Sequence, residues 1–260
     1  KNPFLDIEKI KERQFYVDYF FNDVLLRENV REKLKDIYDI ERIAGKIIYG
    51  TENGKDLLSL KDSIRKSLET YRLLKEHQEL KKIFELDIEI LLDIYNKIEL
   101  IIDAEAPFSV REGGIIKDGY NSELDELRRI SKLGKDFILE IEQRERERTG
   151  IKGLKIKYNK VFGYFIEVTK ANEHLVPEDY IRKQTLVNSE RYIVPDLKEY
   201  EEKVITAKSK IEALEYELFK SLSSEIKEHI ESLYKLANRI ANLDIVSNFA
   251  HIATKNSYVK

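Results

Sequence analysis

Hydrophobic residues recur at helical spacing through the first hundred positions of the chain. Over residues 5–100 an apolar side chain returns every three or four positions, and no proline falls inside this range. This period predicts amphipathic helices that pack on one another through their apolar faces. Asn22–Asp23 and the Gly50–Gly54 segment interrupt the pattern and predict helix ends. We therefore expect a bundle of helices, two of which cover residues 55–78 and 83–103.

A further helix is predicted over residues 121–148, and its apolar stripe ends at Ile141. The last two turns, residues 142–148, contain charged and polar side chains without an apolar face. We expect this run to project into solvent, because it has nothing apolar to bury. Its opposite charges lie three or four residues apart and predict the ion pairs Glu142–Arg146 and Glu145–Arg148.

After the charged run the hydrophobic period changes to two. Apolar and polar side chains alternate, as in half-buried strands, and Asn159–Gly163 is expected to form a hairpin loop. The predicted strands cover residues 154–158, 164–169, 182–186 and 191–194. All strand signals fall within residues 151–195, which therefore predict one small antiparallel β domain. Tyr158, Tyr164 and Tyr192 lie on alternating positions and are expected in its core.

Neither glycine nor proline occurs between Asp196 and Thr254, and apolar residues again follow a three-four alternation. This predicts a helix that packs on a partner helix and is roughly 90 Å long if unbroken. Ser221–Ser224 is where we expect a kink or a split. The predicted fold is mainly α: a helical core and two long antiparallel helices that carry a small inserted antiparallel β domain at their tip. The predicted boundaries are 1–120 for the core, 121–150 for the outgoing helix, 151–195 for the β domain, and 196–260 for the returning helix and remaining core.

The composition excludes several classes of site. Without cysteine, the chain has no disulfides, thiolate catalysis or cysteine zinc sites. Its four histidines share no metal-ligand spacing, and no phosphate-binding G-x-x-x-x-G-K-[ST] loop is present. No apolar run reaches the roughly 18–20 residues of a membrane span. We therefore expect no enzyme activity, metal, cofactor or membrane segment in this chain, which lacks methionine, begins with Lys1 and is expected to be an internal fragment.

Charge is unevenly distributed along the chain. The 46 basic and 49 acidic residues give a net charge of −3, but residues 151–195 hold eight basic and five acidic side chains. The predicted β domain therefore carries +3, and the remainder of the chain carries −6. A basic tip on an acidic stalk is typical of a surface that contacts phosphates. The alternative is that lysines on an exposed edge strand only prevent aggregation.

The most specific indication of function lies in long segments of the sequence itself. These segments read RERERTGIKGLKIKYNKVFGYFIEVTKAN (144–172), VPEDYIRKQTLVNSERYIVPDLKEYEEKVI (176–205), REGGIIKDGYNSELDELRRIS (111–131), DIYDIERIAGKIIYGTENGKDLLSLKDS (36–63) and LANRIANLDIVSNFAHIATKNSYVK (236–260). Together they resemble the MutS family of bacterial DNA mismatch repair proteins, and the resemblance covers nearly the whole chain. The last segment is similar to the run that precedes the family's ATPase domain.

The resemblance implies a function and a set of partners. It implies that residues 151–195 form a clamp that contacts the backbone of duplex DNA independently of sequence. The remaining residues would form the core and the levers, which relay the ATP state to the clamp. The resemblance also implies a homodimer, a MutL-like repair partner, and a cytoplasmic, nucleoid-associated protein. ATP and Mg would be bound by an ATPase domain outside this chain, and mismatches would likewise be recognised outside it.

Two sets of residues are predicted to contact DNA. The resemblance places the family's DNA-facing positions on Arg182, Lys183, Gln184, Thr185 and Asn188. In this interpretation Arg182 and Lys183 neutralise phosphates, and Asn188 donates a hydrogen bond to one. The second set, expected from the basic character of the segment, is Lys155, Lys157 and Lys160. Some relatives carry a basic residue where this chain has Val187, which removes one plausible phosphate contact.

A protein of another class remains as the competing hypothesis. In that hypothesis the chain is a helical scaffold whose long stripe binds partner helices, and its β tip is inert. Salt-dependent retention on duplex DNA separates the two hypotheses, because an inert scaffold shows none.

Overall fold

The computed structural model describes residues 5–109, 113–159 and 163–258. Lys160, one of the predicted DNA contacts, lies outside the described residues. The chain divides into two compact units. The core unit comprises Lys1–Lys117 and Glu217–Lys260, and the sheet unit comprises Asp118–Tyr216.

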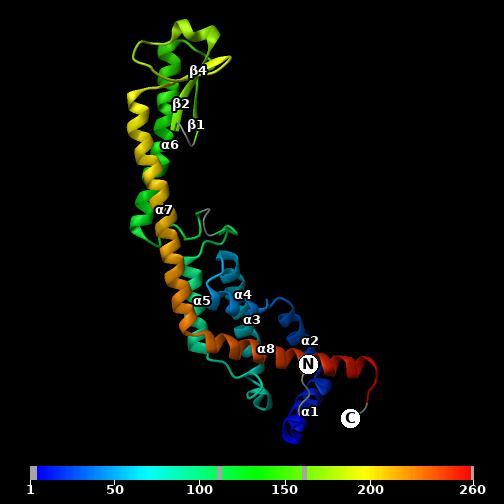
Figure 1. Ribbon diagram of the computed structural model, residues 1–260. Helices are drawn as coiled ribbons and strands as arrows, with labels where there is room; N and C mark the ends of the chain where they lie inside the picture. The colour runs from blue at the N-terminus through cyan, green and yellow to red at the C-terminus, as the bar shows by residue number, and fades with distance from the viewer. Residues whose placement is uncertain (1–4, 110–112, 160–162, 259–260) are drawn as a thin grey trace. The chain divides into compact units, whose positions relative to one another are not determined.

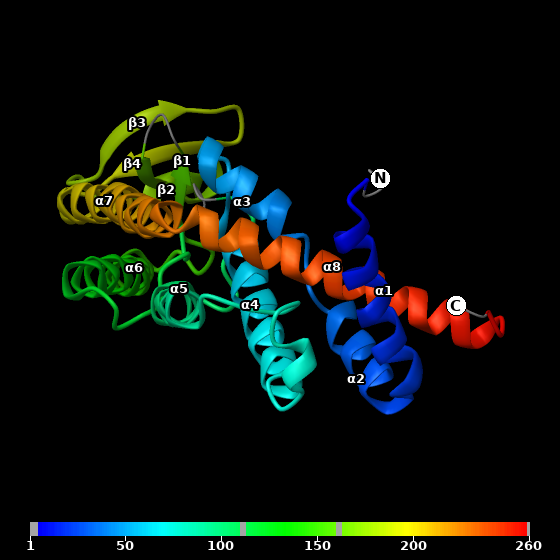
Figure 2. The same ribbon diagram turned by 90° about the horizontal axis from the view of Figure 1, so that it is seen from below.

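The core unit is built from helices (Figure 1). Its elements are α1 (Ile7–Asn22), α2 (Val24–Lys35), α3 (Ile40–Tyr49), α4 (Gly54–Leu74), the short 3₁₀ helix η1 (Gln78–Leu80), α5 (Ile88–Ile101), the end of α7 (Pro195–Glu228) and α8 (Ile230–Lys255). Helix α8 packs against α1, α2, α3 and α5. Figure 2 shows it passing alongside α1 and α2. The predicted mainly helical fold of this part of the chain is confirmed.

Both predicted interruptions of the helical pattern are confirmed, and local chemistry explains each. The Asp23 carboxylate accepts a hydrogen bond from the Leu26 amide at 2.9 Å and caps the start of α2. Gly50 ends α3 with a φ of 67°, a left-handed conformation that glycine adopts without steric cost. Asn53 and Asp56 then form a reciprocal capping box at the start of α4.

Two of the helices are shorter than the sequence predicts. Helix α4 ends about a turn earlier than expected, and α5 begins more than a turn later. The intervening segment contains η1, and its apolar side chains Leu80, Ile83 and Phe84 are buried. They join a core cluster that includes Phe20 of α1 and Leu243 of α8. Burial in this cluster, rather than continued helix, accounts for the apolar pattern there.

The predicted break in the long C-terminal helix lies at a different place. Ser221–Ser224 remains helical, and α7 continues to Glu228. The helix breaks instead at His229, whose φ of −105° and ψ of 21° depart from helical values. Leu222 and Ser223 are both buried in the core unit, so the serine-rich turn is held in place by packing. The expectation of a kink at the serines was therefore wrong.

The sheet unit combines two helical segments with a four-stranded antiparallel sheet. Its elements are α6 (Ser122–Thr149), β1 (Lys155–Asn159), β2 (Gly163–Thr169), the 3₁₀ helix η3 (Lys170–Leu175), β3 (Ile181–Thr185), β4 (Ser189–Ile193) and the first part of α7. The strand order is β1-β2-β4-β3. The alternation of apolar and polar residues predicts this small antiparallel sheet. It does not predict the 3₁₀ helix η3.

Helix α6 and the first part of α7 run antiparallel within the sheet unit. Arg128, near the start of α6, donates to the Glu215 carboxylate at 2.7 Å, and Arg144, near its end, donates to Asp196 at 2.9 Å. The sheet lies at the end of the pair where α6 finishes and α7 begins (Figure 1). Figure 2, which looks nearly along the two helices, shows the sheet at one side of them.

The charged end of α6 is covered along one side, whereas the missing apolar face led us to expect the whole run in solvent. Glu142, Glu145 and Arg146 are buried or half-buried, and the other four residues of the run are exposed. Glu145 is 1% exposed and accepts a hydrogen bond from the buried Tyr180 hydroxyl at 3.0 Å. The Glu142 carboxylate accepts from the Ile156 amide at 2.8 Å, and the Arg146 guanidinium donates to the Leu154 carbonyl at 2.8 Å. The β segment therefore covers one side of this run, and hydrogen bonds from Tyr180 and Ile156 and to Leu154 make the contact.

The predicted ion pairs within the charged run are present. Arg146 lies 2.5 Å from Glu142, and Arg148 lies 3.4 Å from Glu145. Arg148 also binds Asp179, which precedes β3, so one guanidinium connects α6 to the β segment. The ion pairs thus neutralise charges within residues 142–148 and also join this run to the β segment.

Candidate nucleic-acid interface

The two faces of the sheet differ in chemistry. Ile166, Val168 and Tyr192 pack with Ile141 of α6 and Leu197 of α7 in one apolar cluster. The face that carries them, the inner face, is therefore directed at the helices. Side chains alternate along a strand, so the intervening residues form the opposite outer face. Its members include Lys155 and Lys157 of β1, Phe165 and Glu167 of β2, Gln184 of β3 and Arg191 of β4.

The outer face holds a cluster of cations around one carboxylate. Lys157 lies 2.8 Å from Glu167, and Arg191 lies 3.4 Å from the same carboxylate. The hydrogen bond from Lys157, opposed in part by desolvation, lowers the pKa of Glu167. Lys155 lies opposite Glu167 in the β1–β2 register, is exposed, and has no ion pair with any described carboxylate. Lys155, Lys157 and Arg191 thus outnumber the one acid on this face.

Arg191 is the most firmly held of these cations. Its guanidinium lies 4.4 Å from the centroid of the Phe165 ring and donates to the Gln184 amide oxygen at 2.8 Å. Stacking on an aromatic ring and a fixed hydrogen bond reduce the number of rotamers open to a long side chain. The sequence prediction did not include Arg191 among the contacts. Its alternation with Tyr192 indicates the face, but only the strand register brings it beside Gln184 and Glu167.

The structure divides the predicted stretch on β3 between different surfaces. The β3–β4 register shifts between Arg182 and Gln184, so Lys183 occupies a bulge. Gln184 lies opposite Arg191 on the outer face, whereas Arg182 and Thr185 lie opposite Tyr192 and Glu190 on the inner side. Lys183 is exposed and has no ion pair with a described side chain. The stretch is therefore not one continuous contact surface.

Arg182 and Thr185 both contact a carboxylate that the sheet covers. Glu190 is 5% exposed and receives hydrogen bonds from Arg182 at 3.3 Å, Thr185 at 3.4 Å and Tyr192 at 2.6 Å. The Tyr192 hydroxyl is the main cause that lowers the pKa of Glu190. Burial, together with this hydrogen bond, raises the pKa of Tyr192 to about 12. Arg182 remains largely exposed but shares its charge with Glu190.

The turn between β3 and β4 presents polar and apolar groups to solvent. Val187 is 85% exposed, and the neighbouring Asn188 is exposed as well. The Asn188 carbonyl accepts a hydrogen bond from the Lys170 amide at 3.2 Å, so the start of η3 lies beside this turn. Lys170 is exposed and has no ion pair among the described side chains. It is a second cation that the sequence prediction did not place near the contacts.

The three tyrosines expected in the core differ in burial. Tyr192 is buried in the cluster beneath the sheet, and Tyr164 is partly buried against it. Tyr158 is 50% exposed, with its ring centroid 5.0 Å from that of Tyr164. It lies on an edge strand, where one flank has no neighbouring strand to cover it.

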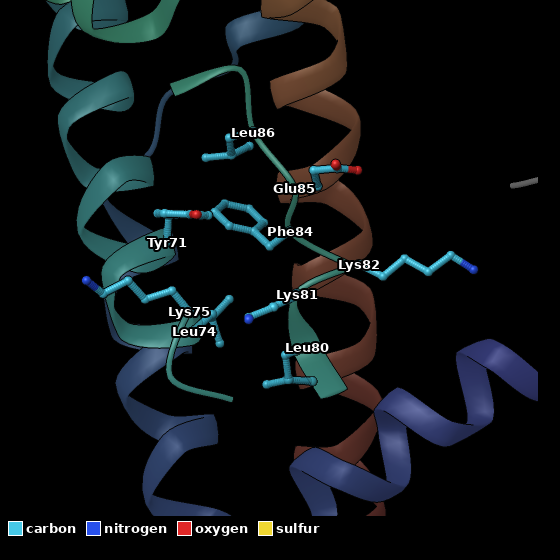
Figure 3. Close-up of a pocket in the computed structure, with 9 residues that line it drawn as sticks. All are labelled: Tyr71, Leu74, Lys75, Leu80, Lys81, Lys82, Phe84, Glu85 and Leu86. Atoms are coloured by element: carbon cyan, nitrogen blue, oxygen red, sulfur yellow. The ribbon is translucent and has the colours of Figure 1, made fainter. Parts of the chain in front are cut away.

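Other kinds of site are not indicated in the part of the chain that the structure describes. Its His, Asp and Glu side chains form no group of three or more that could hold a metal ion. None of its helices has the combination of length and apolar character needed to cross a membrane. A cavity of about 500 Å³ in the core unit is lined by Tyr71, Phe84 and mostly aliphatic or lysine side chains (Figure 3). Its nine lining residues include no histidine and a single carboxylate.

Comparison with known proteins identifies the family. A model of MutS family domain IV matches residues 119–210, which fall inside the sheet unit. The chain is 91% identical over 260 residues to the DNA mismatch repair protein MutS of Fusobacterium nucleatum subsp. nucleatum, with all of this chain and 29% of that protein covered. The chain belongs to the MutS family. The resemblance predicted from its long segments is confirmed.

More distant MutS proteins match the chain equally completely. The DNA mismatch repair protein MutS of Bacillus cytotoxicus is 48% identical over 265 residues, and that of Alkaliphilus oremlandii is 46% identical over 261 residues. Each match covers 100% of this chain but only 29% and 30% of the relative, respectively. The chain thus spans less than a third of the length of these MutS proteins.

Proposed function

We propose that the sheet unit binds duplex DNA through backbone phosphates, as the clamp and lever region of a mismatch repair protein. The relatives named above are DNA mismatch repair proteins, which supports DNA as the ligand. The observation that carries the proposal is the distribution of charge over the sheet. Basic side chains occupy the outer face and the β3 edge, while the nearby acids already bind cations.

The pairing of the acids leaves positive charge available for phosphate. Glu167 is bound by two cations of the outer face, and Glu190 is bound by Arg182 beneath β3. Lys155 and Lys183 have no such partner among the described side chains and are exposed. A phosphate that approaches this face meets uncompensated ammonium groups and few carboxylates. Exposed positive charge is sufficient for the electrostatic part of DNA binding. That part depends on the number of phosphates that the protein neutralises and not on contacts with the bases.

The spacing of the cations suits the duplex backbone. Adjacent strands lie about 4.8 Å apart, so Lys155 on β1 and Lys183 on β3 are separated by roughly 14 Å across three strand spacings. The major groove of B-DNA is about 12 Å wide. Lysines on the two edge strands are therefore placed to reach phosphates on both sides of one groove. A sheet face lying across the groove contacts the backbone, so binding is independent of sequence.

The predicted contacts take different roles in this proposal. Lys155, Lys157 and Lys183 supply charge, and Arg191 supplies a guanidinium held on Phe165. Gln184 and Asn188 offer side-chain amides that donate hydrogen bonds to phosphate oxygens. Arg182 and Thr185 hold Glu190 and thereby the edge strand, and the exposed part of Arg182 adds to the positive field.

In the longer protein, helices α6 and α7 act as levers in this proposal. They contact the sheet at one end through Ile141 and Leu197. The Arg144–Asp196 ion pair joins α6 to α7 at the same end. A movement of the helices is therefore transmitted to the sheet. The ATPase domain that would drive the movement lies outside this chain and remains a prediction of the family resemblance. The homodimer and the MutL-like partner are likewise predictions of that resemblance.

Fluorescence anisotropy on a short duplex at several salt concentrations tests the proposal. The parent chain should bind in the non-specific range of roughly 10⁻⁴–10⁻⁶ M, with equal affinity for matched and mismatched duplexes. The double variant Lys155→Gln/Lys183→Gln should bind more weakly. The magnitude of its slope of log K against log salt should be smaller by about 1.8, because each lost phosphate contact removes about 0.9. Lys208→Gln, on α7 and 74% exposed, is the matched control and should leave both quantities unchanged.

The reverse change adds a cation at the β3–β4 turn. Val187→Lys should tighten binding and steepen the slope by about 0.9 if this turn faces phosphate. An unchanged slope in the double variant would place the contact surface elsewhere. Absence of salt-dependent binding by the parent chain would favour the scaffold hypothesis instead.

A further inference from the structure

One carboxylate occupies the middle of the outer face of the sheet. Glu167 lies on β2, an interior strand, and the registers place it opposite Lys155 of β1 and Arg191 of β4. Lys157, two positions further along β1, reaches it diagonally. Among the strand residues that the structure describes, Glu167 is the one acid of this face. It therefore lies among three of the cations to which the proposed function assigns phosphate.

The ion pairs of Glu167 occupy donors that a phosphate also needs. Lys157 Nζ lies 2.8 Å from Oε1 of Glu167, and Arg191 Nε lies 3.4 Å from Oε2, so both carboxylate oxygens are engaged. The hydrogen bond from Lys157 lowers the pKa of Glu167, which keeps the carboxylate ionised at neutral pH. Carboxylate and phosphate oxygens accept hydrogen bonds from the same N–H groups. A DNA phosphate at this position therefore competes with Glu167 and is repelled by its charge.

Arg191 does not depend on Glu167 for its position. Its guanidinium stacks on Phe165 with 4.4 Å to the ring centroid, and it donates to Gln184 at 2.8 Å, a shorter contact than the 3.4 Å to Glu167. These two contacts remain when the charge of Glu167 is removed. The guanidinium then stays on the outer face with one acid fewer beside it.

Lys157 is the more adaptable of the two partners. Its side chain is 52% exposed, and its register partner on β2 is Phe165, which offers no charge. Without Glu167 the ammonium group is open to solvent and to an incoming phosphate, because an exposed ion pair of this kind is weak and easily exchanged. Loss of the carboxylate therefore increases the positive charge that the face presents.

We propose that Glu167 limits the affinity of the sheet for DNA by acting as an internal counter-charge. In the free protein it occupies donors of Lys157 and Arg191, and in the complex it repels the phosphate that approaches them. The inference rests on the proposed function and concerns the regulation of the same surface. Its consequence is a weak, readily reversible contact, because a phosphate gains these cations only in competition with Glu167. The alternative is that Glu167 positions the two cations for phosphate, and it predicts a change of affinity in the opposite direction.

Fluorescence anisotropy of the whole chain on a short duplex, at several salt concentrations, tests the inference. Glu167→Gln keeps the size of the side chain and removes its charge. This variant should bind DNA about three- to tenfold more tightly than the parent chain. The magnitude of its slope of log K against log salt should be larger by about 0.9, because one more phosphate is neutralised. A folding defect lowers affinity, so a gain cannot come from one. Glu167→Asp retains the charge and should bind less tightly than Glu167→Gln.

Glu178→Gln is the matched control. Glu178 is exposed, lies in the same unit and has no ion pair with a described side chain, so its loss changes the net charge equally without releasing a cation. Its affinity should stay within about twofold of the parent, since solvent screens such a charge. An equal gain in this control would show that net charge alone matters and would overturn the inference.

The remaining outcomes separate this inference from the proposed function. If the parent chain binds DNA with a salt dependence and Glu167→Gln binds equally or more weakly, the counter-charge role is wrong and the proposed function stands. If neither the parent chain nor Glu167→Gln shows salt-dependent binding, the proposed function fails and the inference fails with it.

Discussion

Replacing Glu145 tests the hydrogen-bonded contact between the charged end of α6 and the β segment. The Glu145 carboxylate is 1% exposed and accepts from the Tyr180 hydroxyl and from Arg144 Nε, both at 3.0 Å. A hydrogen bond to a charged group contributes about 1.5–3 kcal/mol, and a buried hydroxyl left without a partner costs about 1–3 kcal/mol. Arg144 is half exposed and regains water, so its loss adds little. Glu145→Ala should therefore destabilise the sheet unit by about 3 kcal/mol.

Hydrogen exchange of the β2 and β4 amides, read by mass spectrometry on the whole chain, measures this effect locally. Each 1.4 kcal/mol is tenfold in an opening equilibrium, so exchange in Glu145→Ala should accelerate about a hundredfold. Tyr180→Phe removes the hydroxyl without stranding a donor and should accelerate exchange by about tenfold. Glu147→Ala, an exposed position on the same helix, is the matched control and should have little effect.

The double variant Glu145→Ala/Tyr180→Phe tests whether the unpaired Tyr180 hydroxyl contributes to the loss of stability. If the stranded hydroxyl carries part of the cost, Glu145→Ala/Tyr180→Phe should exchange no faster than Glu145→Ala alone. Additive acceleration in the double variant would show that the two side chains act independently. Exchange in Glu145→Ala within about threefold of the parent would show that the buried carboxylate does not hold the β segment on α6.

Three further outcomes are expected. The double variant Arg182→Glu/Lys183→Glu should nearly abolish duplex binding in the anisotropy titration, because it replaces two positive charges at the β3 edge by two negative ones and removes the arginine that binds the buried Glu190. Parent-like affinity would contradict this. Gly163→Ala should lower the free energy of unfolding, measured in urea, by about 1–2 kcal/mol or more, since φ is 75° there and an added Cβ would overlap a carboxylate of α7. Gly153→Ala has open space and should be nearly neutral. The pKa of Glu167 is lower in the folded state than its unfolded value of 4.5, so its ionised carboxylate stabilises the fold at pH values above 4.5. The free energy of unfolding, measured in urea, should therefore fall as the pH drops below 4.5. Glu167→Gln should make this part of the pH profile flatter.

The sequence by itself determined the secondary structure and the family. Apolar side chains at spacing three and four indicate the helices, and the change to a period of two after residue 150 indicates the strands. Capping residues such as Asn53 act on the backbone a few positions away, so the sequence reveals them directly. Long segments resembling MutS carried the functional prediction, because they preserve many positions at once.

Only the tertiary structure decided which polar residues are buried and which surface they form. The run 142–148 has no apolar stripe, yet Glu145 is covered, since its partner Tyr180 comes from a distant segment. Likewise, Arg182 and Gln184 are two residues apart and would share a face in a regular strand, but a bulge at Lys183 directs them to different faces. Arg191 joins the outer cluster because the β2–β4 and β3–β4 registers bring Glu167 and Gln184 beside it. Periodicity describes one element at a time, whereas hydrogen bonds between elements depend on register and packing, which no local pattern contains.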